Sequence, residues 1–451
     1  MKRKISSVLN QWKTSPLRQP LLVRGARQVG KTYSVTDFGK GNFENMVSVN
    51  FEEQPELADC FSEYDTQAII DRLSIFTKSV IRPGQTLLFL DEIQECPRAI
   101  TSLRYFYEKM PELHVIGAGS LIEFALRSKD FRMPVGRIQS VFMFPLSFDE
   151  FLWALGEDNL CRHLKTVNPE KQLEKIFKNR LENLIRTYLL VGGMPASVNA
   201  YANKIPMEEI QRQQQGLIRT YGADFAKYAS TAKHKYLRQV YDSAPRMVGR
   251  RYKYSHVNPD IQSKFLKDAF NLLCDARCLT KIRHSSGAGL PMAAGVNEKI
   301  FKVAYLDVGM MQNALGIQSS IALNMPVMTI NAGGVAEQFV AQELLAAADP
   351  YAEPGLFFWA RDARGSNAEV DYLVHIQGKI FPVEVKAGAT GSLKSMKLFL
   401  EKYPDTPFGI RYSMHELSFH DRILSIPLYM IRNTEGLIQN LLNPTAFGAV
   451  K

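Results

Sequence analysis

Short apolar runs alternate with helix-length segments over the first 150 residues of the chain. The runs are Leu21–Val23, Met46–Phe51, Thr86–Leu90, His114–Ile116 and Ser140–Phe144. This spacing is typical of βαβ units, in which a helix connects neighbouring parallel strands. The pattern therefore predicts an α/β fold with a parallel sheet in an N-terminal domain at residues 1–155.

The pattern becomes mainly helical after Phe148, which predicts a helical region at 156–230. A further helix is expected to start at Asn258, because this residue can cap a helix whose first position is Pro259. Two apolar runs at 279–282 and 300–306 predict a pair of strands. Helices followed by a two-stranded ribbon are typical of a winged helix, so a winged-helix-like domain is predicted at 231–325.

A second α/β unit is predicted at residues 333–435. Residues 325–334 are interpreted as a linker that ends in Gly333 and Gly334. A helix pattern follows at 336–347, and strand patterns follow at 356–360, 370–376 and 380–385. A second helix is expected at about 392–402, with more strands after it.

Composition narrows the class of protein. The chain has 451 residues, of which 46% are apolar and 22% charged, and these values exclude a disordered or collagen-like chain. Its five cysteines are too few and too scattered for a disulfide framework. No apolar run approaches the ~18 residues of a membrane helix, and no signal peptide is recognised at the start. We therefore expect a cytoplasmic protein without a membrane partner.

The positive charge is concentrated in one segment. The formal net charge is +10, and residues 203–302 contain 18 Lys and Arg against 8 Asp and Glu, so this segment carries the whole excess. Cations alternate there with tyrosines, at Arg219, Lys227, Lys233, Lys235, Arg238, Arg246, Arg250, Arg251 and Lys253 and at Tyr221, Tyr228, Tyr236, Tyr241, Tyr252 and Tyr254. Cations for phosphates and rings for stacking would suit DNA. The alternative is a solvated helical face whose tyrosines pack inward.

A phosphate-binding loop is the strongest chemical signal. It follows the first predicted strand and consists of Gly25, Ala26, Arg27, Gln28, Val29, Gly30, Lys31 and Thr32, with Tyr33 next. These residues match G-x-x-x-x-G-K-[ST] between a strand and a helix. Glycines let backbone N–H groups face phosphates, Lys31 neutralises the β- and γ-phosphates, and the Thr32 hydroxyl binds Mg²⁺. ATP and Mg²⁺ are the predicted ligands.

Acidic and polar residues follow two later strands. Asp91 and Glu92 end the buried run at 87–90, where Asp91 would complete the Mg²⁺ shell and Glu92 would activate water for hydrolysis. Ser120 follows the next strand and is interpreted as a γ-phosphate sensor or a helix N-cap. Arg137 is the candidate arginine finger or phosphate sensor, with a surface ion pair as the alternative and with Arg127 and Arg132 nearby.

An acidic hairpin is predicted in the last unit. Gly378 and Lys379 suit a two-residue turn, which would place Asp371 opposite Lys386 and Leu373 opposite Glu384. Asp371, Glu384 and Lys386 would then share one sheet face. Their spacing is that of the PD-(D/E)xK nucleases, in which two carboxylates bind Mg²⁺ and a lysine acts on the attacking water. Glu337 is expected to be a third carboxylate, with Glu343 as a rival. The alternatives are a cross-strand ion pair and a fold that binds DNA without cutting it.

These motifs together resemble a known family over nearly the full length of the chain. They comprise the phosphate loop, Leu90 to Gln94, Gly136-Arg137, Pro145 to Phe151, Gly192-Gly193-Met194-Pro195, Leu306 to Gly309 and Glu369-Val370-Asp371. The chain resembles prokaryotic AAA-type ATPases that carry a C-terminal domain of uncharacterised role with a restriction-endonuclease-like fold. The resemblance implies ATP binding and hydrolysis and a helical plus winged-helix middle.

Two functions are consistent with this pattern. The first is an ATP-driven protein acting on DNA, in which the nucleotide state gates a nuclease-like domain. The second is a nucleotide-switched regulator that binds protein or DNA and does not cut it. Metal-dependent DNA cleavage distinguishes the two, and the pattern leaves the oligomeric state open.

Overall fold

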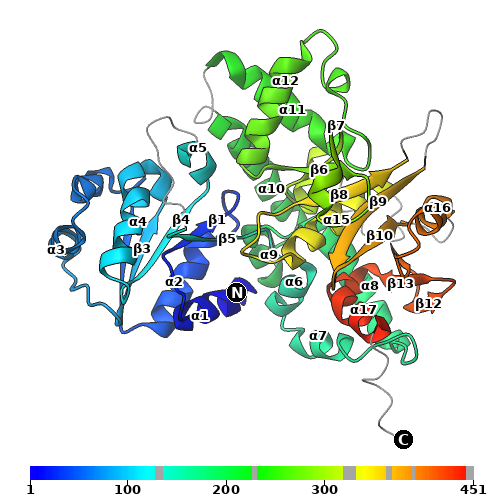
Figure 1. Ribbon diagram of the computed structural model, residues 1–451, viewed down its shortest axis with the longest axis horizontal. Helices are drawn as coiled ribbons and strands as arrows, with labels where there is room; N and C mark the ends of the chain where they lie inside the picture. The colour runs from blue at the N-terminus through cyan, green and yellow to red at the C-terminus, as the bar shows by residue number, and fades with distance from the viewer. Residues whose placement is uncertain (127–135, 226–230, 318–331, 362–367, 388–391, 443–451) are drawn as a thin grey trace, which may run out of the picture.

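A computed structural model describes residues 1–126, 136–225, 231–317, 332–361, 368–387 and 392–442. Figure 1 shows an N-terminal α/β part, a group of helices, and a second α/β part that contains the larger sheet. None of the described helices has the length and apolar content needed to cross a bilayer.

The N-terminal sheet has five parallel strands in the order β2-β3-β4-β1-β5. Its strands are β1 (Leu21–Arg24), β2 (Asn45–Asn50), β3 (Thr86–Asp91), β4 (His114–Gly119) and β5 (Gln139–Phe142). Its helices are α1 (Ile5–Thr14), α2 (Lys31–Asn42), α3 (Thr66–Thr77), α4 (Pro97–Lys109) and α5 (Ile122–Leu126), with short 3-10 turns η1 (Pro55–Phe61) and η2 (Ile93–Glu95). Apolar clusters cover both faces, from α1 and α2 on one side and from α3 and α4 on the other. The predicted α/β fold of this part is confirmed.

Helices dominate the middle of the chain, as predicted. They are α6 (Phe148–Ala154), α7 (Asp158–Leu164), α8 (Lys175–Val191), α9 (Pro195–Ala202), α10 (Met207–Asp224), α11 (Thr231–Met247), α12 (Ser263–Asp275) and α13 (Val308–Ala314), with 3-10 turns η4 (Tyr254–His256) and η5 (Met292–Gly295). The predicted helix start at Asn258 is wrong, because the Asn258 side chain accepts the Asp260 N–H at 2.9 Å and forms a turn. Helix α12 begins five residues later, and Leu266, Ala269 and Leu273 are its buried stripe.

The second sheet has eight strands in the order β12-β13-β11-β10-β9-β8-β6-β7. They are β6 (Leu279–Ser285), β7 (Val296–Tyr305), β8 (Leu356–Ala360), β9 (Glu369–Ile376), β10 (Lys379–Val385), β11 (Gly409–Ser413), β12 (Ser418–His420) and β13 (Ile423–Pro427). The helical elements of this part are α15 (Ala332–Ala347), α16 (Lys394–Lys402), η6 (Leu428–Asn433) and α17 (Thr434–Leu442). Gly333 and Gly334 lie within α15 rather than in a linker.

The strand pair β6–β7 corrects the predicted winged-helix domain. The two strands pair antiparallel as expected, but β6 also pairs in parallel with β8. The ribbon predicted for 231–325 is therefore part of the same sheet as the strands of 333–435. The backbone groups on the second edge of β6 take their hydrogen bonds from this pairing.

The hairpin β9–β10 forms, but its two-residue turn lies one residue earlier in the chain than predicted. The turn consists of Gln377 and Gly378, with φ angles of 50° and 75°, and Lys379 already pairs with Ile376. A turn of this kind needs positive φ at both central positions. Leu373 therefore pairs with Pro382, and continuing the register places Asp371 opposite Glu384 rather than Lys386. The two carboxylates still share a face, because paired residues of antiparallel strands project to the same side.

Candidate functional site

The phosphate loop joins β1 to α2 in the predicted position. Its backbone turns through positive φ at Gly25 (154°), Gln28 (60°) and Gly30 (93°). A Cβ atom on Gly25 would lie only 2.3 Å from the carbonyl oxygen of Met143, so a larger residue does not fit there. The glycines thus allow a tight loop directly before the N-terminus of α2, where backbone N–H groups favour an anion.

Lys31 lies inside this loop. Its side chain is buried, and its Nζ donates to the carbonyl oxygens of Gly25 at 3.0 Å and Ala26 at 2.9 Å. Burial lowers the pKa of Lys31 to about 8, although Glu92 and Asp91 act in the opposite direction. The ammonium is therefore poorly solvated, and a phosphate group would stabilise its charge.

The residues predicted to bind Mg²⁺ and to activate water lie at the same edge of the sheet. The Thr32 hydroxyl donates to Asp91 Oδ2 at 2.8 Å, and Asp91 Oδ1 accepts the Glu92 N–H at 3.1 Å. Burial raises the pKa of Asp91. Glu92 has a left-handed backbone (φ 47°), and its Oε2 accepts from Gln94 at 2.6 Å. A hydroxyl beside a carboxylate fits Mg²⁺, which prefers oxygen ligands.

Ser120 also lies at this edge, directly after β4, and it is buried. Its hydroxyl accepts from Arg27 Nε at 3.3 Å, and Arg27 Nη1 forms an ion pair with Asp224 of α10 at 2.6 Å. Tyr33 is 54% exposed on α2, with its hydroxyl 2.8 Å from the amino group of Met1. Ser120 and Arg27 thus connect the end of β4 through the phosphate loop to the helical region.

Arg137 is not brought to this site. It precedes β5, whose first residue Gln139 pairs with Leu21 at the start of β1. The phosphate loop follows the end of β1, so Arg137 lies at the opposite edge of the parallel sheet. Its Nε contacts Glu108 Oε1 at 3.1 Å. Arg137 is therefore not placed to sense phosphates bound at the loop of its own chain, and the surface ion pair that was the alternative is present. A role as an arginine finger stays a prediction, and Arg127 and Arg132 lie outside the described residues.

A buried ion pair that we did not predict supports the loop. Arg3 donates from Nη1 to the Val29 carbonyl at 2.8 Å and from Nε to Glu150 Oε1 at 3.0 Å. Glu150 also completes a capping box with Ser147 at the start of α6. The Ser-x-x-Glu spacing was visible in the sequence, whereas no signal distinguished Arg3 from the other N-terminal cations.

We expect Glu150→Ala to lower the free energy of unfolding by about 3 kcal/mol, because Arg3 would remain buried without its counter-charge. Thermal and urea unfolding followed by circular dichroism would measure this loss. The matched control is Asp158→Ala, whose partner Lys2 is exposed and whose loss should cost less than about 1 kcal/mol. Equal losses in the two variants would contradict the proposed support.

Two glycine-containing motifs meet beside the loop. The Gly193 N–H donates to Asp307 Oδ2 at 2.6 Å, and a Cβ on Gly192 would lie 2.1 Å from Asp307 Oδ1. Gln342 of α15 donates to Asp307 Oδ2 at 3.4 Å, and Pro195 lies 3.4 Å from a Cβ built on Gly30. The segment 192–195 therefore lies between the phosphate loop and Asp307, which in turn contacts helix α15.

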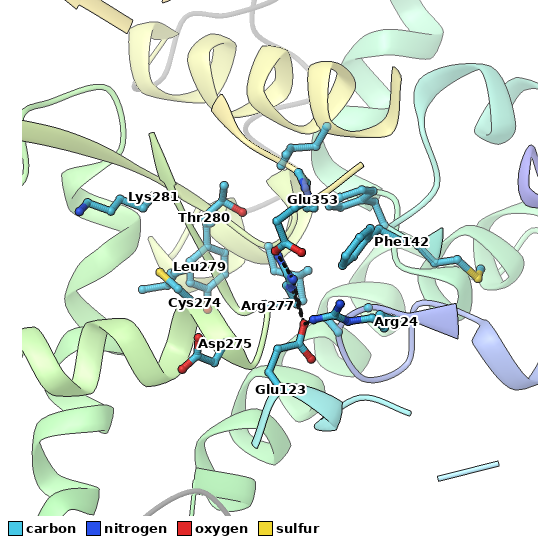
Figure 2. A pocket seen from close by; sticks show the side chains of 18 of the residues that line it. Arg24, Glu123, Phe142, Cys274, Asp275, Arg277, Leu279, Thr280, Lys281 and Glu353 are labelled. Atoms are coloured by element: carbon cyan, nitrogen blue, oxygen red, sulfur yellow. Dashed lines mark hydrogen bonds and ion pairs between the residues drawn. The ribbon is translucent and has the colours of Figure 1, made fainter. Parts of the chain in front are cut away.

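A cavity of about 360 Å³ lies between the loop and strand β6. Figure 2 shows Glu123 between two arginines in this cavity. Glu123 Oε1 accepts from Arg24 at 3.0 Å and from Arg277 at 2.8 Å, and Arg277 also contacts Glu353 at 2.6 Å. These ion pairs cross from the N-terminal part to the second α/β part.

The predicted hairpin carboxylates gather with a lysine that was not predicted. Lys302 of β7 places its Nζ 3.2 Å from Glu337 Oε2, 3.4 Å from Asp371 Oδ1 and 2.7 Å from Glu369 Oε1. Glu384 Oε1 accepts from Lys386 at 2.6 Å. We call Glu337, Glu369, Asp371, Glu384 and Lys302 the carboxylate cluster.

Burial and neighbouring charges both shift the pKa values of this cluster. It raises the pKa of Glu337 and of Glu384 to about 7, and the charge of Asp371 adds to both shifts. Burial alone would lower the pKa of Lys302, but Glu337, Asp371 and Glu369 outweigh it and raise that pKa. The rival Glu343 lies elsewhere and accepts the Phe148 N–H at 2.8 Å. Lys302 was missed because β7 was assigned to a separate wing.

Three of the described tyrosines of the basic segment are buried. Tyr221, Tyr241 and Tyr252 are buried, and Tyr236 stacks on Phe265 with ring centroids 5.3 Å apart. Tyr228 and Lys227 lie outside the described residues. The inward-packing alternative therefore holds for these three buried rings, whereas Tyr236 and Tyr254 are half-buried. Several cations remain exposed on α11 and just after it, namely Lys233, Lys235, Arg238, Arg246 and Arg250.

Family models match three parts of the chain. Residues 17–152 match the model of an AAA domain, so the N-terminal part is similar to AAA-type P-loop domains. Residues 182–321 and 332–431 match two domains of unknown function, DUF8612 and DUF4143. The boundary between these last two falls between β7 and β8, which belong to one sheet. A search of curated proteins found no match.

Three solved structures illustrate the similarity of this chain to known proteins. The Walker-type ATPase PABY2304 of Pyrococcus abyssi has 14% identity and a TM-score of 0.45, covering 70% of this chain and 95% of that chain. The ORC1 protein of Aeropyrum pernix in complex with DNA has 13% identity and a TM-score of 0.30, covering 72% and 93%. AMPPCP-bound DnaA from Aquifex aeolicus has 15% identity and a TM-score of 0.27, covering 60% and 92%.

Proposed function

We propose that this protein binds and hydrolyses Mg-ATP in its N-terminal domain and acts on DNA through its middle and C-terminal parts. The observation that carries the ATPase proposal is the contact between Thr32 and Asp91 beside Lys31 and Glu92. Such a group is what phosphoryl transfer to water requires, since the protein supplies positioning and charge.

Each residue of this group has a separate role in the proposed reaction. Lys31 neutralises the β- and γ-phosphates, and Thr32 and Asp91 would hold Mg²⁺, which would supply further positive charge for the phosphates. Glu92, held by Gln94, orients a water molecule and takes its proton. Ser120 contacts Arg27, and Arg27 forms an ion pair with Asp224 of the helical region. Loss of the γ-phosphate beside Ser120 could therefore alter this ion pair.

The proposed DNA surface is the exposed cationic side of α11 and the residues directly after it. Arg251 pairs with Glu369 at 2.8 Å, and a Cβ on Gly249 would lie 3.0 Å from Glu337 Oε1. DNA bound along these cations would therefore run toward the carboxylate cluster. Its phosphates would displace counterions, so the affinity should fall steeply with salt.

We expect the triple variant Lys235→Glu, Arg238→Glu and Arg246→Glu to weaken DNA binding at least about tenfold and to lower the salt slope by roughly 2 to 3. The ATPase rate without DNA should stay near that of the wild type, because these exposed side chains are not among the residues of the proposed ATP site. Fluorescence anisotropy with labelled duplex, single-stranded and branched DNA at several salt concentrations would measure this.

The matched control for that variant reverses three exposed lysines elsewhere, Lys40, Lys78 and Lys171. It changes the net charge by the same amount, so a global charge effect would weaken binding in both variants. Arg251 is left unchanged, because its reversal would also disturb Glu369. Binding that does not depend on salt would contradict the proposed surface.

The second candidate function is the nucleotide-switched regulator that binds DNA without cutting it. The position of Lys302 among the carboxylates favours it, because this ammonium already neutralises part of the cluster. The experiment that separates the two functions measures ATP hydrolysis with each DNA form and DNA cleavage in the same tube, with Mg²⁺ and with Mn²⁺. DNA-stimulated hydrolysis with intact DNA would favour the regulator.

A further inference from the structure

Lys302 is an unusually buried cation. Its side chain is 1% exposed, although lysine is rarely enclosed unless it is paired. Three carboxylates lie within 3.4 Å of its Nζ, and the ring of Phe358 lies 5.5 Å away. All three donors of the ammonium therefore face acceptors, and the group is held in one place.

The charges of the cluster are nearly balanced by side chains alone. Four carboxylates, those of Glu337, Glu369, Asp371 and Glu384, face the cations of Lys302, Arg251 and Lys386. A divalent ion would add two positive charges to this nearly balanced set. It would also lie close to a buried ammonium, where repulsion is poorly screened.

The oxygen atoms of Asp371 and Glu384 are largely engaged. Asp371 Oδ1 contacts Lys302, and its Oδ2 accepts the Val385 N–H at 2.8 Å. Glu384 Oε1 accepts from Lys386, whereas its Oε2 is buried without a hydrogen-bond partner. Within the described ranges, no three His, Cys, Asp or Glu side chains are arranged to hold a metal. The residues as placed therefore do not fit the metal that a nuclease-like site implies.

We infer that Lys302 is the resident cation of the carboxylate cluster, that it excludes a divalent metal ion from Asp371 and Glu384, and that the domain contacts DNA without hydrolysing it. This inference rests on the binding-only form of the proposed function. According to this inference, Lys302 of β7, which lies outside the hairpin, determines whether the carboxylates bind a metal ion or form only ion pairs.

The test titrates the full chain with Mn²⁺ in the absence of nucleotide and follows free Mn²⁺ by electron paramagnetic resonance. The wild type and the Asp371→Asn variant should bind the same amount of Mn²⁺, because Asp371 is expected to hold none. Lys302→Met should gain one Mn²⁺ per chain, with a Kd at least about 100-fold below the highest Mn²⁺ concentration at which the wild type still shows no Asp371-dependent binding, because a repelling charge is lost. The double variant with Asp371→Asn should lose it again.

The matched control is Lys299→Met, which removes an exposed lysine of the same strand and should bind like the wild type. An Asp371-dependent Mn²⁺ in the wild type would overturn the inference, and this comparison holds even if Lys302→Met does not fold. A folded Lys302→Met variant without added binding would overturn it as well. Failure of the ATPase or DNA-binding tests would affect the proposed function and leave this measurement unchanged.

Discussion

Replacing Glu92 with Gln should leave ATP binding within a few-fold of the wild type and lower the turnover number by roughly 100-fold or more. Glu92 has a left-handed backbone directly after Asp91. The hydrogen bond between Thr32 and Asp91 does not involve the Glu92 side chain. The variant therefore keeps the proposed metal ligands and loses only the group that takes a proton from water. Nucleotide binding by fluorescence and phosphate release under saturating ATP would measure the two effects separately.

The matched control for this experiment is Glu95→Gln, which makes the same change three residues later at an exposed position of η2. Its turnover should equal that of the wild type. Normal turnover in Glu92→Gln would show that another residue activates the water. Equal losses of binding and turnover would place Glu92 among the binding residues instead.

Lys31→Ala should abolish hydrolysis and weaken nucleotide binding by at least about 100-fold, because Lys31 is the cation enclosed by the phosphate loop. Burial lowers the pKa of Lys31 to about 8, because the ammonium is poorly solvated in the loop, and bound phosphates would stabilise its charge. The folded state should not be lost, since the removed group forms only two hydrogen bonds to the loop. Isothermal titration with ATP and with ADP would measure the change in affinity.

Lys40→Ala is the control, because Lys40 is exposed at the other end of the same helix α2. It should bind and hydrolyse ATP as the wild type does. A Lys31→Ala variant that still hydrolyses ATP at the wild-type rate would exclude the loop as the catalytic site, whatever its fold.

The N-terminal site could be predicted because its signals are local. Each buried run, such as Thr86–Asp91, is followed directly by its polar residues. Parallel strands end at one edge of a sheet, so Thr32, Asp91 and Ser120 had to come close once the strands were recognised. The same rule, applied to residues that precede a strand, would have placed Arg137 away from the phosphate loop of its own chain.

The C-terminal site was predicted only in part, because its contacts are distant in the chain. Lys302 lies 35 positions from Glu337 and 69 from Asp371, and nothing distinguishes it from the other cations of its segment. Its location depends on the pairing of β6 with β8, which is a contact between separate predicted domains. The hairpin register depended on the φ angle that Gln377 adopts, which composition does not reveal.

The parallel pairing of β6 with β8 has a consequence for how the protein is made. The hairpin of β6 and β7 leaves the ribosome on the order of seconds before β8, since α13 and α15 are translated in between. During this interval one edge of β6 has no strand beside it, and such an edge pairs readily with other chains. Nascent or shortened chains that end before Leu356 should therefore aggregate or recruit chaperones, and expression of the middle segment by itself should yield insoluble material.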